Sequence, residues 1–153
     1  MTRRLIGALA IITTLLLSGC GNDYGVDQYG QKVAAERLDK QWLVVNYWAE
    51  WCGPCRTEIP ELNALSEQLK GQNVGVFGVN FDNVQGAELK EASDKLGIKF
   101  TVLAQNPDGI FDIPRSEALP VTYIIDDKGK VREQLMGEQT AEGVLAKLKA
   151  LRG

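Results

Sequence analysis

The sequence predicts an α/β domain in which a central mixed β-sheet is flanked by helices. Short apolar runs alternate with segments whose apolar residues recur every three or four positions, as in layered α/β folds. Residues 42–48 form a continuous apolar run, which is typical of a strand buried on both faces. Residues 126–129, Asp-Asp-Lys-Gly, separate two further strand-like segments and favour a hairpin. The 153 residues fit one domain.

The predicted elements follow one another with short connections. We expect an edge strand over 32–35, a helical turn over 36–40, strands over 42–48 and 74–80, helices over 54–69 and 86–96, a short strand over 100–104, strands over 121–126 and 131–136, and a final helix capped by Thr140. Pro54 suits the first helical position, and Gly71 follows the end of that helix. Its inner stripe consists of Ile59, Leu62, Leu65 and Leu69.

The first twenty residues have the pattern of a secretory signal. Arg3 and Arg4 precede an apolar stretch over residues 5–17, too short to span about 30 Å of hydrocarbon as a permanent helix. One interpretation is an ordinary signal peptide. The order Leu17-Ser-Gly-Cys20, however, closely resembles the bacterial lipoprotein signal. That resemblance implies cleavage after residue 19 and lipidation of Cys20.

The lipoprotein resemblance divides the chain into three parts and places it in the cell. Residues 1–19 are the signal peptide, residues 20–30 are a lipidated N-terminus and tether, and residues 31–153 are the folded domain. The protein is then anchored to a membrane and faces the periplasm, with the choice of inner or outer membrane left open. A formal net charge of −3 and the lack of a basic cluster give no sign of nucleic-acid binding. We expect a monomer.

Cys52 and Cys55 lie three positions apart at a predicted strand-to-helix junction. Cys52 just precedes the helix, where unpaired N–H groups and the helix dipole favour a thiolate, so we predict that it is the nucleophile. Cys55 lies one turn inside the helix and is placed to resolve a mixed disulfide. A structural disulfide would ordinarily close a longer loop. A zinc site needs about four ligands, whereas the chain has three cysteines and no histidine. We therefore predict a redox disulfide without a metal or other cofactor.

The segment Val44-Val-Asn-Tyr-Trp-Ala-Glu-Trp-Cys-Gly-Pro-Cys55 resembles the active site of the thioredoxin superfamily. The likeness extends through Leu119-Pro120-Val121 and implies the thioredoxin fold, with residues 86–96 and the strand before them as a TlpA-like insertion. It also implies thiol–disulfide oxidoreductase activity. The substrate groove would be formed by Trp51, Gly53, Pro54, Leu119 and Pro120. The resemblance implies a cis Pro120, although only about 5–6% of X-Pro bonds are cis.

Two positions depart from thioredoxin proper. Asn46 stands where thioredoxin has a buried aspartate, and Gly78 stands near its lysine. The pattern Cys52-x-x-Cys55-x-x-Glu58-x-Pro60 is similar to the membrane-tethered reductases of the TlpA, ResA and CcmG kind. In that group a glutamate at this position tunes the cysteine pair. We hypothesise that Glu58 accepts or returns the Cys55 proton; the alternative is an exposed helix glutamate.

The direction of exchange is predicted from the dipeptide between the cysteines. Gly53-Pro54 is the dipeptide of thioredoxin, whose potential is about −270 mV, against about −120 mV for the oxidant DsbA. We therefore predict a reductase of protein disulfides, as in cytochrome c maturation. The resemblance implies a membrane electron donor of the DsbD or CcdA kind. The alternatives are a disulfide oxidant or isomerase, and a non-catalytic copper- or thiol-binding module.

Overall fold

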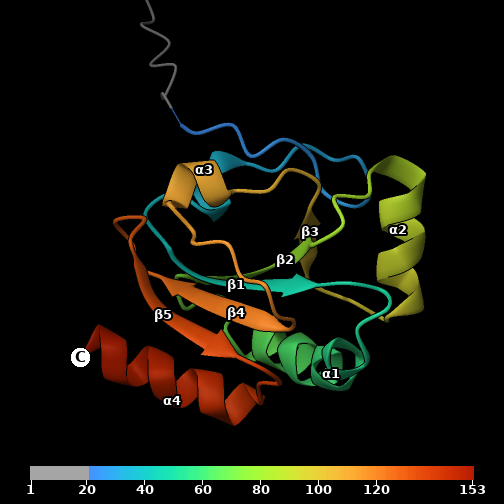
Figure 1. Ribbon diagram of the computed structural model, residues 1–153. Helices are drawn as coiled ribbons and strands as arrows, with labels where there is room; N and C mark the ends of the chain where they lie inside the picture. Colours follow the sequence, from blue (N-terminus) through green and yellow to red (C-terminus); the bar gives the residue numbers. More distant parts are fainter. Residues whose placement is uncertain (1–20) are drawn as a thin grey trace, which may run out of the picture.

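The computed structural model describes residues 21–153, so the predicted signal peptide and Cys20 lie outside the described residues. Within this range the elements follow the predicted alternation of strands and helices (Figure 1). They are a 3-10 helix η1 (Ala35–Arg37), β1 (Trp42–Trp48), α1 (Gly53–Gln68), β2 (Val74–Asn80), α2 (Gly86–Lys95), β3 (Thr101–Leu103), α3 (Asp108–Phe111), β4 (Val121–Ile125), β5 (Val131–Met136) and α4 (Ala141–Arg152).

The strands form one mixed sheet in the order β3-β2-β1-β4-β5. β1 pairs in parallel with β2, and β2 in parallel with β3, whereas β4 is antiparallel to both β1 and β5. β1 is central and all seven of its residues are buried, which agrees with its continuous apolar run. This is the predicted thioredoxin-like arrangement. The parallel pairing places the carboxyl ends of β1 and β2 at the same edge of the sheet.

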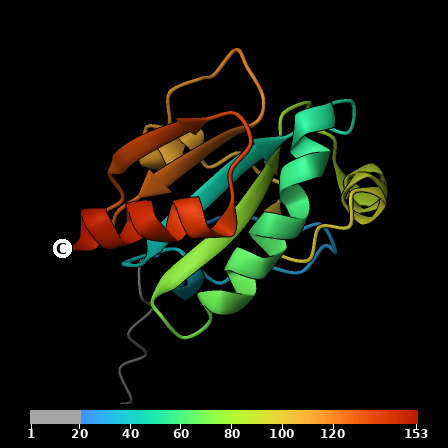
Figure 2. The same ribbon diagram turned by 90° about the horizontal axis from the view of Figure 1, so that it is seen from below.

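Helices cover both faces of the sheet, but unequally. α1 and α4 lie against one face, with α2 beside α1 (Figure 2). Their apolar residues share a cluster with one set of strand side chains, including Val44 and Trp48. The opposite face packs against α3 and the segment before β1 (Figure 1), and its cluster includes Tyr24 and Phe111. The cysteines belong to the first cluster, so α1 carries them on the more extensively covered face.

The segment before β1 differs from the sequence-based expectation. Residues 32–35 are not a strand, because Lys32 forms only an isolated bridge with Val26 and η1 begins at Ala35. Residues 21–30 were expected to be a tether, yet Tyr24 and Gln28 are buried. The Gln28 side chain donates to the Phe100 carbonyl at 3.1 Å and accepts from the Val102 N–H at 2.8 Å. The packed part of the chain therefore begins before residue 31.

Two smaller differences concern a short helix and the helix ends. The structure contains α3, which follows Pro107 and spans a single turn that the sequence analysis did not predict. α1 begins one residue earlier than expected, at Gly53, with Cys52 as its N-cap. Thr140 caps α4 as predicted, because its side chain accepts from the Gly143 N–H at 3.1 Å. No helix between residues 21 and 153 is long and apolar enough to cross a membrane.

Candidate active site

The predicted cysteine pair forms a disulfide where β1 leads into α1. The Cα atoms of Cys52 and Cys55 are 5.3 Å apart. The Cys52 Sγ accepts a hydrogen bond from the Cys55 N–H at 3.2 Å, so the sulfur replaces the oxygen of an ordinary helix cap. The same N–H group and the helix dipole would stabilise a thiolate on Cys52 after reduction.

The two sulfur-bearing residues differ in access to solvent. Cys52 is 4% exposed to solvent, whereas Cys55 is fully buried. Gly53 and Pro54, between them, are exposed and leave the first turn of α1 open to an approaching chain. An incoming group can therefore reach Cys52 but not Cys55. The roles of Cys52 as nucleophile and Cys55 as the resolving cysteine stay predictions, and this difference favours them.

Glu58 is buried rather than exposed, which excludes the alternative reading of it as a surface glutamate. Its side chain is 1% exposed and points inward from α1, one turn after Cys55. The Asn46 amide donates to Glu58 Oε1 at 2.6 Å, and the Gln139 N–H donates to Oε2 at 3.1 Å. The Asn46 amide also donates to the hydroxyl oxygen of Thr122, its partner on β4, at 3.0 Å.

Burial raises the pKa of the Glu58 carboxyl from 4.5 to about 7. The hydrogen bonds from Asn46 and Gln139 oppose that rise, and the charge of Glu138 adds to it. Desolvation dominates because an ionised carboxylate loses its hydration when α1 packs on the sheet. Glu58 can therefore gain or lose a proton near neutral pH, as a group that exchanges protons with a thiol must.

Asn46 leaves one buried acceptor free beside this carboxyl. Its Oδ1 has no hydrogen-bond partner among residues 21–153. The arrangement suits ionised Glu58, since the amide nitrogen faces the carboxylate. Rotation of the amide by half a turn would present Oδ1 to a protonated Glu58 instead. The pair can thus be satisfied in either protonation state of the carboxyl.

The predicted groove residues lie around the junction of β1 and α1. The peptide bond between Leu119 and Pro120 is cis, as the resemblance implied. Val121 pairs with Tyr47 in the β1–β4 register, so Pro120 lies beside the carboxyl end of β1. Leu119 packs against the cluster that contains both cysteines.

Trp51, the other predicted groove residue, is 67% exposed. Its indole N–H donates to Asp82 Oδ2 at 2.8 Å. This bond fixes the ring beside Cys52 without burying it. Trp48, by contrast, is fully buried. Trp51 therefore offers an apolar surface to a docking chain, and Trp48 packs in the core.

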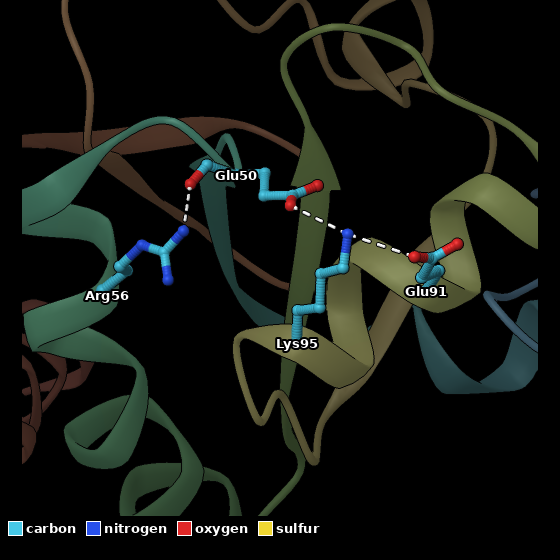
Figure 3. Close-up of polar contacts among 4 residues, drawn as sticks. All are labelled: Glu50, Arg56, Glu91 and Lys95. Carbon is cyan, nitrogen blue, oxygen red and sulfur yellow. Dashed lines mark hydrogen bonds and ion pairs between the residues drawn. The ribbon is translucent and has the colours of Figure 1, made fainter.

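A hydrogen bond and an ion pair connect the loop before Cys52 to the two neighbouring helices (Figure 3). Arg56 on α1 donates to the Glu50 carbonyl at 2.8 Å. Lys95 on α2 lies 3.2 Å from the Glu50 carboxylate and 3.1 Å from Glu91. Exposed pairs of this kind contribute little to stability, because solvent screens the charges. The Lys95–Glu50 pair connects α2 to the active-site loop.

Sequence reasoning missed the partners that hold Glu58. Asn46 was noted only as a replacement for an aspartate, yet a polar residue in an apolar strand signals a buried partner, because unpaired polar groups are costly to bury. Thr122 carried the same signal in β4. Gln139 acts through its backbone N–H, which no sequence pattern marks. Among residues 21–153 no three His, Cys, Asp or Glu side chains gather as a metal site would require.

Comparison with known proteins decides the family. The family model described as AhpC/TSA matches residues 16–134. The thiol-disulfide oxidoreductase ResA of Bacillus thuringiensis is 32% identical over 125 residues, which cover 82% of this chain and 72% of ResA. The chain belongs to the AhpC/TSA family. It is a thioredoxin-superfamily thiol–disulfide oxidoreductase similar to ResA.

Solved structures agree with this assignment. A thiol:disulfide interchange protein of Chlorobium tepidum superposes with a TM-score of 0.69 at 25% identity, over 84% of this chain and 92% of that one. A DsbF homologue from Corynebacterium diphtheriae gives a TM-score of 0.68 at 20% identity, over 82% of both chains. The second likeness concerns the fold alone. Together they confirm the predicted arrangement of sheet and helices.

Proposed function

We propose that this oxidoreductase reduces protein disulfides outside the cytoplasm, with Cys52 as nucleophile and Cys55 as resolving cysteine. The difference in burial between the two cysteines carries the assignment of roles. The Gly53-Pro54 dipeptide supports the reducing direction, because it is that of thioredoxin, whose potential is about −270 mV. The groove for the substrate chain comprises Trp51, Gly53, Pro54, Leu119 and Pro120.

The exchange proceeds through a mixed disulfide. The Cys52 thiolate attacks one sulfur of the substrate disulfide, and the other substrate sulfur leaves as a thiolate. The Cys55 thiol then loses its proton and attacks the Cys52 sulfur. This step forms the Cys52–Cys55 disulfide and releases the second substrate thiolate. Two electrons pass to the substrate, which ends as a dithiol after it takes up two protons.

Glu58 is the proposed acceptor of the Cys55 proton. Both side chains face the interior from α1, where bulk water does not reach the Cys55 thiol. A carboxyl with a pKa of about 7 is close enough to an ordinary thiol pKa of about 8.5 for the proton to move either way. In the opposite direction of exchange, Glu58 returns the proton to Cys55.

The midpoint potential of the Cys52–Cys55 pair tests the direction of exchange. Tryptophan fluorescence of the soluble domain, followed in dithiothreitol or glutathione buffers, reports the fraction oxidised. A value near or below about −250 mV supports a reductase. A value above about −180 mV assigns the protein to the oxidants or isomerases instead. The Cys52→Ser variant should lose all exchange, and Cys55→Ser should accumulate the mixed disulfide.

The proposed cellular setting includes a lipid anchor on Cys20 and a location facing the periplasm. Electrons would come from a membrane protein of the DsbD or CcdA kind, and the protein would act as a monomer. Mass spectrometry of the membrane-extracted protein tests the anchor. We expect residue 20 at the N-terminus with an acyl modification, and release of the protein into the soluble fraction by Cys20→Ala. A Cys20→Ala protein that stays with the membrane would contradict lipid anchoring.

A further inference from the structure

A cavity of about 210 Å³ lies at the edge of the sheet that carries the disulfide. It opens on the side of β1 opposite to α1, between the carboxyl ends of the parallel strands and the chain that leads into β4. Its walls include Tyr47, Asn80, Phe81, Asn106, Arg115 and Val121. None of these residues takes part in the exchange chemistry described above.

The cavity is adjacent to the substrate groove. Val121, in its wall, follows Pro120 directly. Asn80 pairs with Trp48 in the β1–β2 register, and the Phe81 N–H donates to the Trp48 carbonyl at 2.8 Å. Asn80 also lines a second hollow, which contains Trp51. When a substrate cysteine is bound at Cys52, substrate residues close to it in sequence can reach this cavity. Each residue of an extended chain spans about 3.3 Å.

The hydrogen-bond acceptors of the cavity are already occupied. Asn106 Oδ1 accepts from the Tyr47 hydroxyl at 2.7 Å and from the Asp108 N–H at 3.2 Å. The Asp108 carboxylate accepts from the Asn106 amide at 3.1 Å and from the Gly109 N–H at 2.7 Å. Both of these contacts come from the loop that carries Asp108, and its negative charge stays in the cavity wall, where it adds to the burial that raises the pKa of Tyr47.

The donors of the cavity are not occupied in the same way. Asn80 is 5% exposed, and its Oδ1 accepts from the N–H groups of Asp82 and Val84 at 2.9 and 3.4 Å. Its amide nitrogen has no partner among residues 21–153, and the Arg115 guanidinium forms no ion pair within that range. The Asn80 amide and the exposed Arg115 guanidinium are therefore both available to an acceptor that the protein itself does not supply.

We propose that this cavity binds an acidic side chain of the protein substrate, close in sequence to the cysteine that Cys52 attacks. Arg115 and the Asn80 amide would hold the carboxylate, and Val121 and Phe81 would pack on its aliphatic stem. The inference rests on exchange with protein disulfides and adds the specificity of that exchange. The hollow around Trp51 has the opposite character, because Glu50, Asp82 and Glu88 line it with Arg56. The preference for an acid therefore applies to one side of the target cysteine.

A peptide series tests the cavity. Short peptides with one intramolecular disulfide carry Glu, Gln or Lys at a single position, one to three residues before or after a cysteine. Their second-order rate constants with the reduced protein are followed by tryptophan fluorescence. At one or more positions on one side, the Glu peptide should react about tenfold faster than the Gln peptide, as expected for a charge-assisted hydrogen bond. The Lys peptide should be the slowest of the three there.

Two variants assign the preference to the cavity. Arg115→Gln should bring the Glu-to-Gln rate ratio to about one while leaving the midpoint potential unchanged. Asn80→Asp, which keeps an acceptor for the turn and removes the free donor, should lower the same ratio. Lys128→Gln makes an equal change in net charge in an exposed turn at the other end of β4 and should retain the preference.

Each contrary result has a definite meaning. Equal rates for Glu and Gln peptides at every position, or a Glu preference that persists in Arg115→Gln, would overturn the acidic specificity and leave the oxidoreductase activity standing. Loss of the preference in Lys128→Gln would also overturn it, because the effect would then follow net charge. Failure of the wild-type dithiol to react with any peptide would overturn the activity on protein disulfides as well.

Discussion

The amide nitrogen of Asn46 lies 2.6 Å from Oε1 of Glu58, inside the protein and between the central strand and the helix that carries the cysteines. The thioredoxin resemblance placed an aspartate at position 46, on the strand. In this chain the buried acid comes from α1 instead, and the strand supplies its hydrogen-bond donor. The acid therefore belongs to the same helix as Cys55, and the amide on the strand opposes the rise in its pKa that burial causes.

The burial of Glu58 predicts a pH-dependent contribution to stability. Its pKa in the folded protein, about 7, exceeds the ordinary value of 4.5, so folding retains a proton that the unfolded chain releases. The stabilising contribution is complete below pH 4.5 and is lost as the pH rises to about 7. Relative to Glu58→Gln, the wild type should lose about 3 kcal/mol of unfolding free energy across that window. Urea unfolding of the oxidised proteins at a series of pH values measures it. Parallel profiles for the two proteins would contradict the raised pKa.

The same carboxyl should shape the pH dependence of the exchange reaction. Without it, the Cys55 thiol has no buried acceptor for its proton. Glu58→Gln removes a negative charge beside the Cys55 thiolate and should therefore lower the pKa of Cys55. The loss of the proton acceptor should nevertheless slow resolution of the mixed disulfide by about 10²-fold or more near neutral pH. Glu67→Gln, on the exposed face of the same helix, is the matched control and should leave the rate unchanged. Thiol titration by alkylation and stopped-flow kinetics provide the two readouts. Unchanged thiol pKa values in Glu58→Gln would remove Glu58 from the mechanism.

Removal of the Asn46 amide should raise the pKa of Glu58 further. The hydrogen bond from Asn46 favours the ionised carboxyl, and a bond to a charged group contributes about 1.5–3 kcal/mol. In Asn46→Ala the pH-dependent loss of stability should therefore extend about one pH unit or more above the wild-type window. Thr122→Val is the control, since Thr122 touches the same amide and makes no hydrogen bond to Glu58. If the pH window of the stability loss moved equally in both variants, general repacking would be the cause of the shift.

Gln28 should contribute to stability far more than its place in an expected tether suggests. Gln28→Ala leaves the Phe100 carbonyl and the Val102 N–H without their buried partner. Unpaired buried groups cost about 1–3 kcal/mol, which corresponds to a fall in Tm of about 4 °C or more. Gln31→Ala changes an exposed side chain nearby and should alter stability by less than about 0.5 kcal/mol. Thermal unfolding of the two variants compares them, and similar Tm values would refute the role of Gln28.

A side chain at Gly78 should strain the core, because its neighbours must shift to make room for a Cβ atom. A Cβ atom there would lie 3.0 Å from the indole nitrogen of Trp48 and 3.0 Å from Phe100 Cε2. Gly78→Ala should destabilise the protein by about 1–3 kcal/mol and change the near-UV circular dichroism of Trp48. Gly109→Ala meets no atom within 4 Å and should leave both quantities nearly unchanged. An unaltered Trp48 signal in Gly78→Ala would show that the core accommodates the methyl group.

Much of the fold could be predicted because its signals are local. The buried run at 42–48, the apolar stripe of α1 and the Thr140 cap each indicate structure within one turn or strand, and the structure has all three. The single turn α3 carries too few residues for any periodicity. The segment before β1 was assigned to a tether because its polar residues signal solvent, whereas Gln28 uses its polarity to pair with a distant strand.

The site was predictable to the extent that one short motif contains it. Cys55 and Glu58 share α1, so their spacing predicted a common face, and Cys52 is the N-cap of the same helix. The donors to Glu58 come from elsewhere in the chain, namely Asn46 on β1 and the backbone of Gln139. The cavity beside Pro120 is assembled from still more segments. Such features depend on tertiary packing, which a single sequence does not display.

The side-chain amide of Gln28 forms hydrogen bonds with the edge strand β3 and the residue before it, as a backbone peptide group of a further strand would. Together with the Gln28 N–H, which donates to the Val102 carbonyl at 3.0 Å, it occupies the outer polar groups of β3. Exposed strand edges invite pairing with other chains and aggregation. Gln28 therefore covers the edge of the sheet formed by β3. At the other edge, no strand among residues 21–153 pairs with the outer side of β5. Sheet extension by another polypeptide is therefore confined to β5, whose last residue, Met136, is opposite Val121 next to the cis proline.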